Sequence, residues 1–197
     1  MLEECNTFKR RSAQWAQGQL KPSQREYIKL LTDVYENASV QVVSTSTIDF
    51  LPVWGEGFGE GILEAHKKSK AKVKRIFVFD ELAAVTEASI EEMKKQYLAE
   101  IDVRVYSVKE DYALVFPDGF DKNFAFVDDG DVIVVTNPAS GSIFSGTFYF
   151  KEKGFIDSYK SVVKDLEIKS KAFEVFMKKH DSTWAPPNKP VSTAPKA

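Results

Sequence analysis

The segment from Val73 to Phe79, which reads Val-Lys-Arg-Ile-Phe-Val-Phe, constrains the fold of this chain most. It ends in four successive apolar residues, a pattern typical of a central strand that is buried on both faces of a parallel sheet. Segments 55–70 and 89–100, on either side of it, carry apolar side chains at helical spacing. A strand between two helices indicates a βαβ arrangement, in which right-handed crossovers join parallel strands. The sequence therefore predicts an α/β fold with a mainly parallel sheet flanked by helices.

Further segments extend this pattern in both directions along the chain. Residues 23–38 have the apolar spacing of an amphipathic helix, and 40–48 form a β-branched run that starts apolar and becomes rich in hydroxyls. A strand is predicted at 101–108. Two apolar runs, 124–127 and 132–135, flank Asp128-Asp129-Gly130-Asp131, which predicts a hairpin because Asp and Gly tolerate the positive φ angles of a tight turn. A strand at 145–150 and one long helix at 154–179, straight or bent, complete the expected elements.

The length of 197 residues suits one domain with extensions. We assign the α/β domain to residues 23–179. Residues 1–22 are predicted to be an N-terminal arm or a weak helix, because few apolar residues are spread through them. Residues 180–197 hold four prolines among polar side chains, a composition that buries too little apolar surface to order itself. We therefore predict a disordered Pro-rich tail.

Composition excludes several classes of protein. The single cysteine, Cys5, rules out an intramolecular disulfide and a multi-cysteine metal centre, which favours a reducing compartment. No signal-peptide pattern opens the sequence, and no window approaches the roughly 18 apolar residues of a transmembrane helix. We expect a cytoplasmic protein that does not enter the membrane. The formal charge of −2 gives no general attraction to polyanions, so nothing favours a nucleic-acid partner.

No catalytic or cofactor signature is found. The glycines at 55, 57, 59 and 61 lack the following Lys-Ser/Thr of a phosphate-binding loop and alternate with acids or apolar residues. The two histidines, His66 and His180, lie in a predicted helix and beside the tail, which gives no triad pattern. The acidic cluster at 128–131 has the hard oxygen ligands that Mg²⁺ or Ca²⁺ prefers, but a tight turn selects the same residues. We predict no cofactor and no metal.

Polar side chains gather where two predicted strands end. Thr45, Ser46, Thr47 and Asp49 close the first strand with Trp54 just beyond, and Asp80 and Glu81 follow the strand 73–79. Ligand sites of parallel sheets lie at the carboxyl ends of the strands, where hydroxyls, carboxylates and an indole can bind a small polar molecule. The alternative is structural: the hydroxyls cap the next helix and the indole packs on the core. These seven residues are the predicted ligand-binding candidates.

The order of these segments resembles one half of a phospholipase D-like domain. The resemblance covers roughly residues 27–176 and rests on Ser44-Thr45-Ser46-Thr47-Ile48-Asp49-Phe50, on the strands 73–79 and 101–105, and on Asn123-Phe124-Ala125-Phe126-Val127-Asp128-Asp129. It implies a fold in which active members pair two such halves, within one chain or between chains. This chain has one half, so the resemblance implies a homodimer.

The catalytic string of that family is His-x-Lys-x-x-x-x-Asp, in which histidine attacks phosphorus and lysine neutralises the developing charge. With Asp128 matched to the aspartate, the histidine and lysine positions hold Asp121 and Asn123; with Asp129 they hold Lys122 and Phe124. Either match removes the nucleophile. Non-catalytic copies of the fold serve as sensing or regulatory domains, so the resemblance implies a module that binds a protein partner or a small polar ligand. The competing hypothesis is an enzyme of another type that works through Asp49, Asp80 and Glu81 with a divalent metal.

Overall fold

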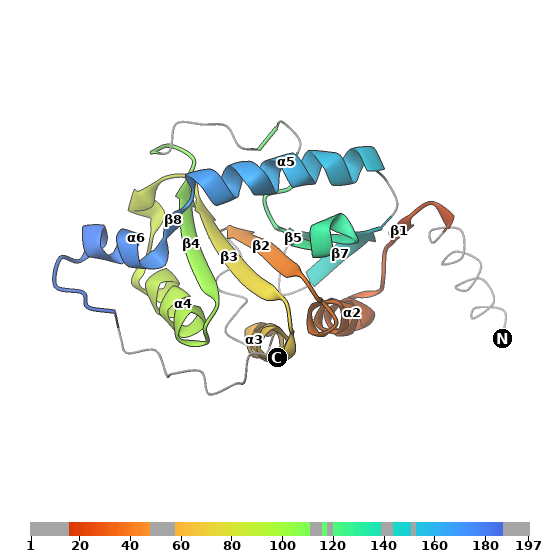
Figure 1. The fold of residues 1–197 in the computed structure, drawn as a ribbon, viewed down its shortest axis with the longest axis horizontal. Coiled ribbons are helices and arrows are strands. Elements are labelled where there is room, and N and C mark those ends of the chain that lie inside the picture. The colour runs from red at the N-terminus through yellow and green to blue at the C-terminus, as the bar shows by residue number, and fades with distance from the viewer. Residues whose placement is uncertain are drawn as a thin grey trace.

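The strands form one mixed sheet. The computed structural model describes residues 16–47, 58–110, 116–117, 120–138, 144–150 and 153–186. Within them, eight strands pair in the order β1-β7-β6-β5-β2-β3-β4-β8 (Figure 1). Their bounds are β1 Gln19–Leu20, β2 Gln41–Thr47, β3 Lys72–Phe79, β4 Asp102–Ser107, β5 Phe124–Val127, β6 Val132–Pro138, β7 Phe144–Tyr149 and β8 Lys171–Ala172.

The α/β class is confirmed, whereas the prediction of a mainly parallel sheet is wrong. In the part of the chain that the structure describes, β2 with β3 and β3 with β4 pair in parallel, and the other five pairs are antiparallel. The parallel pairs are the ones joined by helical crossovers, through α3 (Phe58–Lys68) and α4 (Glu87–Leu98). The four residues 128–131, which include the 3₁₀ turn η3 (Asp128–Gly130), link β5 to β6, and so short a connection can only produce an antiparallel pair.

Helices cover both faces of the sheet. The helix α5 (Lys153–Lys169) lies along one face, and α2 (Gln24–Glu36), α3 and α4 lie on the other (Figure 1). Successive side chains of β3 point to opposite faces of the sheet, so the strand contributes to two cores. Ile76 and Val78 pack in the core that α5 closes, whereas Phe77 and Phe79 pack in the core beneath α4. All four are at most 2% exposed, which confirms β3 as a central strand buried on both faces.

The predicted long helix at 154–179 is two helices. α5 ends at Lys169, and α6 (Phe173–His180) begins after the two-residue strand β8. β8 pairs with β4, and the Arg104 side chain fixes the break by donating to the Ser170 hydroxyl (2.8 Å) and the Ser170 carbonyl (2.6 Å). The interruption turns α6 so that Phe173, Phe176 and Met177 join the core beneath α4. Helical spacing alone did not reveal it, because both halves keep an apolar stripe.

Both ends of the described chain pack on the domain. The segment predicted as an arm ends in β1, which pairs with β7 and protects that sheet edge. After α6, Trp184 contacts Phe173 and Tyr97 with ring centroids 5.8 and 6.4 Å apart. The predicted tail therefore begins with residues that pack on the core, and 187–197 lie outside the described residues. Within the described part, no helix is long and apolar enough to cross a membrane.

The predicted hairpin is confirmed, and its turn fastens the sheet. Asp128, Asp129 and Gly130 adopt positive φ angles of 46°, 59° and 100°. The Asp128 carboxylate accepts hydrogen bonds from the backbone N–H groups of Ser39 (2.8 Å), Val40 (2.7 Å) and Gln41 (3.0 Å). Burial opposes ionisation of this carboxyl, but these donors outweigh it and lower its pKa. The turn thus holds the start of β2 in place.

Candidate functional site

The hydroxyls at the end of β2 are engaged with the strand beside it. Thr45 is buried, and its hydroxyl donates to the Lys122 carbonyl (2.7 Å) and accepts from the Phe124 N–H (3.0 Å). The Asn123 side-chain carbonyl accepts from the Thr47 N–H (2.8 Å) and from the Thr47 hydroxyl (3.1 Å). These bonds continue the β2–β5 pairing beyond its backbone ladder. These hydroxyls therefore have a structural use, but it is the pairing with the neighbouring strand and not the helix capping considered as the alternative.

The two acids that follow β3 form ion pairs at the surface. Asp80 pairs with Lys122 (2.9 Å), and Glu81 pairs with Lys109 (2.5 Å). Such exposed pairs contribute little to stability, because water and salt screen their attraction. Two of the remaining candidates, Asp49 and Trp54, lie outside the described residues. The structure therefore brings Thr47 close to Asn123 and Asp80 close to Lys122, and a ligand role for these residues stays a prediction.

Ser46 contacts a buried cation, Arg75, which the sequence did not single out. The Arg75 side chain is 3% exposed and donates from Nη1 to the Ser46 hydroxyl at 3.1 Å. Burial lowers the pKa of Arg75, because a charge loses hydration in the protein interior. A charged residue inside the mostly apolar run 73–79 was the available signal. Arg75 lies in β3, directly beside Ser46, which is one of the predicted ligand residues.

His66, from α3, completes this buried polar centre. Its Nε2 lies 3.3 Å from Arg75 Nη2, and its ring stacks on Tyr35 with centroids 4.6 Å apart. Burial lowers the pKa of His66 well below its usual value, and the neighbouring Arg75 charge lowers it further. Burial likewise raises the pKa of Tyr35 to about 12. His66 is thus a neutral imidazole at neutral pH.

The neutral state of His66 predicts an acid-sensitive fold. The unfolded chain binds a proton at His66 near pH 6.5, whereas the folded chain does so only at lower pH. The contribution is complete above pH 6.5 and is lost as the pH falls toward the folded pKa, with a slope of up to about 1.4 kcal/mol per pH unit. Urea unfolding at a series of pH values will measure it. The slope should vanish in His66→Phe and persist in His180→Gln, which changes the exposed histidine at the end of α6; an equal slope in both variants would contradict the assignment.

A third group near the strand ends is Asp121, which precedes β5. Burial raises the pKa of this carboxyl, and a hydrogen bond from the Asn123 backbone partly opposes the shift. The Tyr159 ring packs nearby against Phe120 and Phe124, with centroids 4.4 and 4.8 Å apart. Among the described residues, no three side chains of His, Cys, Asp or Glu are grouped closely enough to hold a metal ion. Asp121 is therefore a half-buried carboxyl close to a cluster of aromatic rings.

No protein-family model and no curated protein matches the sequence. Among solved structures, the chain is similar to the phospholipase D family member Nuc from Salmonella typhimurium, with 15% identity, 73% of this chain and 88% of that chain covered, and a TM-score of 0.48. It is similar to TrmBL2, an archaeal chromatin protein, with 10% identity, coverage of 78% and 52%, and a TM-score of 0.42. It is also similar to phosphatidylserine synthase from Haemophilus influenzae Rd KW20, with 14% identity, coverage of 75% and 37%, and a TM-score of 0.42. This chain spans about half of TrmBL2 and just over a third of the synthase.

Proposed function

We propose that this chain is a non-catalytic phospholipase D-like half that acts as a regulatory module by binding a protein partner or a small polar ligand. The observation that carries the proposal is the pair of residues at the family's catalytic positions. With Asp128 as the matched aspartate, Asp121 stands in place of the histidine nucleophile and Asn123 in place of the lysine. Asn123 is neutral, so this position supplies no charge to stabilise a phosphoryl transition state.

The contacts of these residues support a structural use of the motif. The Asn123 side-chain carbonyl accepts a hydrogen bond from Thr47, and the Asp128 carboxylate accepts hydrogen bonds from the backbone N–H groups of residues 39–41. With Asp129 matched instead, the positions hold Lys122, which is paired with Asp80, and Phe124, which is 2% exposed in the core. Asn123 and Asp128 thus hold strands together, Lys122 is ion-paired, and Phe124 packs in the core.

We therefore expect no hydrolysis of a generic phosphodiester such as bis(p-nitrophenyl) phosphate. The measurement is release of p-nitrophenol by the full chain after two orthogonal purification steps, with and without EDTA or added Mg²⁺. Asp121→Asn is the matched variant, because it removes the carboxylate and keeps the side chain's shape. Turnover that survives purification and is lost in Asp121→Asn would refute the non-catalytic assignment.

Self-association belongs to the same proposal. A fold that pairs two halves leaves one surface uncovered in a chain that has a single half, and a two-fold dimer is the commonest way to cover such a surface. The helix α2 packs its Tyr27, Leu31 and Tyr35 side chains on the sheet, and it is the element that could keep the chain monomeric. Light scattering over a concentration series should give twice the chain mass. A mass of one chain up to high micromolar concentration would argue against the dimer.

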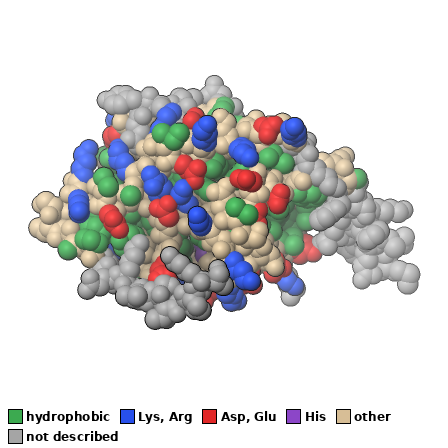
Figure 2. Space-filling model, viewed as in Figure 1, with side chains coloured by type: hydrophobic (Ala, Val, Ile, Leu, Met, Phe, Trp, Pro, Cys, Tyr) green, Lys and Arg blue, Asp and Glu red, His purple; other side chains and the backbone are tan. Residues whose placement is uncertain are grey.

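Charge on the visible surface gives no support to a polyanionic partner. Acidic and basic side chains are interspersed over the face that carries α5 and the edge of the sheet, without a broad region of one sign (Figure 2). Such a mixed surface does not concentrate a nucleic-acid backbone. The proposal therefore keeps a protein or a small molecule as the partner.

A further inference from the structure

The helix α3 buries fewer large apolar side chains than its neighbours on the sheet. From Gly59 onward, those that it buries are Ile62 and Leu63. On the same face of the sheet, α2 and α4 each bury three: Tyr27, Leu31 and Tyr35 in α2, and Ile90, Met93 and Tyr97 in α4. Two glycines, Gly59 and Gly61, also lower the helix propensity of α3. Elements with few buried apolar contacts open at the lowest free energy, so α3 is the helix on this face that should leave the sheet first.

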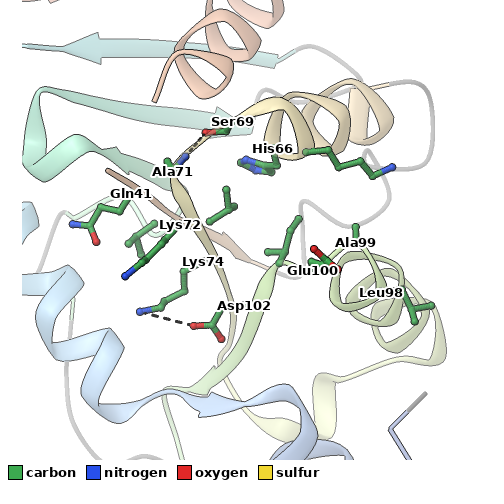
Figure 3. Close-up of a pocket in the computed structure, with 14 residues that line it drawn as sticks. Gln41, His66, Ser69, Ala71, Lys72, Lys74, Leu98, Ala99, Glu100 and Asp102 are labelled. Carbon is green, nitrogen blue, oxygen red and sulfur yellow. Dashed lines mark hydrogen bonds and ion pairs between the residues drawn. The ribbon is translucent and has the colours of Figure 1, made fainter. Parts of the chain in front are cut away.

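His66 of α3 is buried against a cation. Its side chain points from α3 toward the strands (Figure 3) and is 5% exposed. The Nε2 atom lies 3.3 Å from Arg75 Nη2, and it must accept, because a guanidinium has hydrogen-bond donors and no acceptor. The contact therefore requires the neutral imidazole. A proton on Nε2 would set two N–H groups and two positive charges against each other in the protein interior.

The groups that face His66 from α2 and the strands do not compensate a second positive charge. Tyr35 stacks on the imidazole with ring centroids 4.6 Å apart, and burial raises its pKa to about 12, so it is neutral in acid. Ser44 and Ser46 of β2 are buried and uncharged, and the Ser46 hydroxyl accepts from Arg75 at 3.1 Å. Arg75 of β3 is therefore the charge that a protonated His66 would meet.

Other titratable groups nearby act elsewhere. Tyr27 of α2 is neutral, because burial raises its pKa. Glu92 of α4 acts electrostatically on Arg75, and Glu36 at the end of α2 forms a surface ion pair with α3. Within the described residues, the influences that set the charge state of His66 are its burial and the Arg75 charge, and both disfavour the imidazolium.

A cavity lies between the end of α3 and the end of α4. It has a volume of about 750 Å³, and its lining includes His66 and Lys67 of α3 and Leu98 of α4 (Figure 3). Side chains that border such a space have no partner atoms on that side. The end of α3 therefore loses little packing against α4 when the helix moves.

We propose that α3 is an acid-released cover of the sheet: protonation of His66 detaches α3 from β2 and β3 while the rest of the domain stays folded, and it opens Arg75 and Ser46 to water. The detached helix binds a proton at His66 near pH 6.5, as an unfolded chain does, whereas the packed helix does so only at lower pH. Packing of α3 is thus strongest above pH 6.5. As the pH falls, the equilibrium constant for opening rises by up to about tenfold per pH unit. This release differs from acid unfolding of the whole chain, because one helix opens, and it does not depend on the phospholipase D-like assignment.

The test is hydrogen–deuterium exchange of the full chain at pH 7.0 and pH 5.0, with and without low concentrations of urea. Labelling times are scaled to the chemical exchange rate at each pH. At pH 5.0 the opening constant of the α3 amides should be about 10- to 30-fold larger than at pH 7.0. It should change little with urea, because opening one helix exposes little surface. Amides of α5, on the opposite face of the sheet (Figure 1), should be protected more strongly and should depend on urea more steeply.

Two variants that cannot titrate show whether His66 is the group responsible. His66→Phe keeps a ring on Tyr35, and His66→Gln, which serves if the first variant does not fold, keeps an acceptor for Arg75. In each, the α3 opening constant should agree between the two pH values within about twofold. His180→Gln should keep the whole acid response. The proposal is overturned if α3 and α5 open together at pH 5.0 with the same urea dependence, if the α3 opening constant does not rise in acid, or if the rise persists in the His66 variants.

Discussion

Replacing Asp128 with Asn should lower the free energy of unfolding by about 2–3 kcal/mol, because hydrogen bonds to a charged group each contribute about 1.5–3 kcal/mol. Asp128 accepts three backbone N–H groups from residues 39–41, and its two carboxylate oxygens share them. An amide keeps one acceptor oxygen, loses the charge and turns an NH₂ group toward at least one of these donors. The start of β2 would then lose part of its anchorage to the hairpin.

Asp129→Asn is the matched control for this prediction. Asp129 is exposed, has a similar φ angle of 59°, and accepts one hydrogen bond, from the Gln41 side chain at 3.1 Å. Asn tolerates a positive φ angle at both positions, so backbone strain cancels in the comparison. A change within about 0.5 kcal/mol is expected for this variant. Equal losses in the two variants would show that the contacts with residues 39–41 contribute nothing.

The loss of stability in Asp128→Asn, relative to the natural sequence, should depend on pH. Because the folded-state pKa of Asp128 is lowered, its carboxylate stabilises the fold above the unfolded value of 3.8, and this contribution is lost as the pH falls through the folded pKa. Urea unfolding at pH 7 should therefore separate Asp128→Asn from the natural sequence. Near pH 3, part of that separation should be gone. A separation that does not change with pH would mean that the effect is steric.

Replacing Gly146 with Ala should destabilise the fold by about 3 kcal/mol, at the upper end of the usual cost of overpacking a core. Gly146 lies in β7 opposite Thr136, and an added Cβ would overlap the ring of Tyr27 and lie 2.8 Å from the Val135 carbonyl oxygen. Tyr27 is fully buried, and its hydroxyl lies 2.5 Å from the Thr136 hydroxyl. The ring cannot turn aside without breaking that bond, so α2 must move off the sheet.

Two other glycines give controls for the Gly146 prediction. At Gly61 in α3 and Gly154 in α5, an added Cβ meets nothing within 4 Å. Ala is a better helix former than Gly by about 1 kcal/mol, so Gly61→Ala and Gly154→Ala should be neutral or stabilising. Thermal and urea unfolding will measure all three. A double-mutant cycle with Tyr27→Ala should show that part of the Gly146→Ala loss is recovered, and additive effects would exclude the proposed clash.

The sequence determined the elements whose side-chain pattern is local. The apolar run of β3, the helical spacing of α2 and α4, and the Asp-Gly turn between β5 and β6 each report burial or backbone conformation within a few residues, and the structure contains all of them. The same local signals could not reveal the partner of each strand. The mixed sheet follows from the pairing of β5 with β2, strands that stand some 80 residues apart in the chain.

The tertiary structure alone decided how the polar groups of the candidate sites are used. Thr45 and Thr47 were predictable as strand-end hydroxyls, but their bonds to Lys122 and Asn123 join residues far apart in the sequence. In the sequence, His66 is one residue of a predicted helix, and Arg75 is a charged residue within a mostly apolar strand. Their contact depends on how α3 packs on β3. Burial of the pair makes the imidazole neutral, because desolvation depends on the folded environment and not on the residue alone. Within the described residues, His66 Nδ1 has no hydrogen-bond partner.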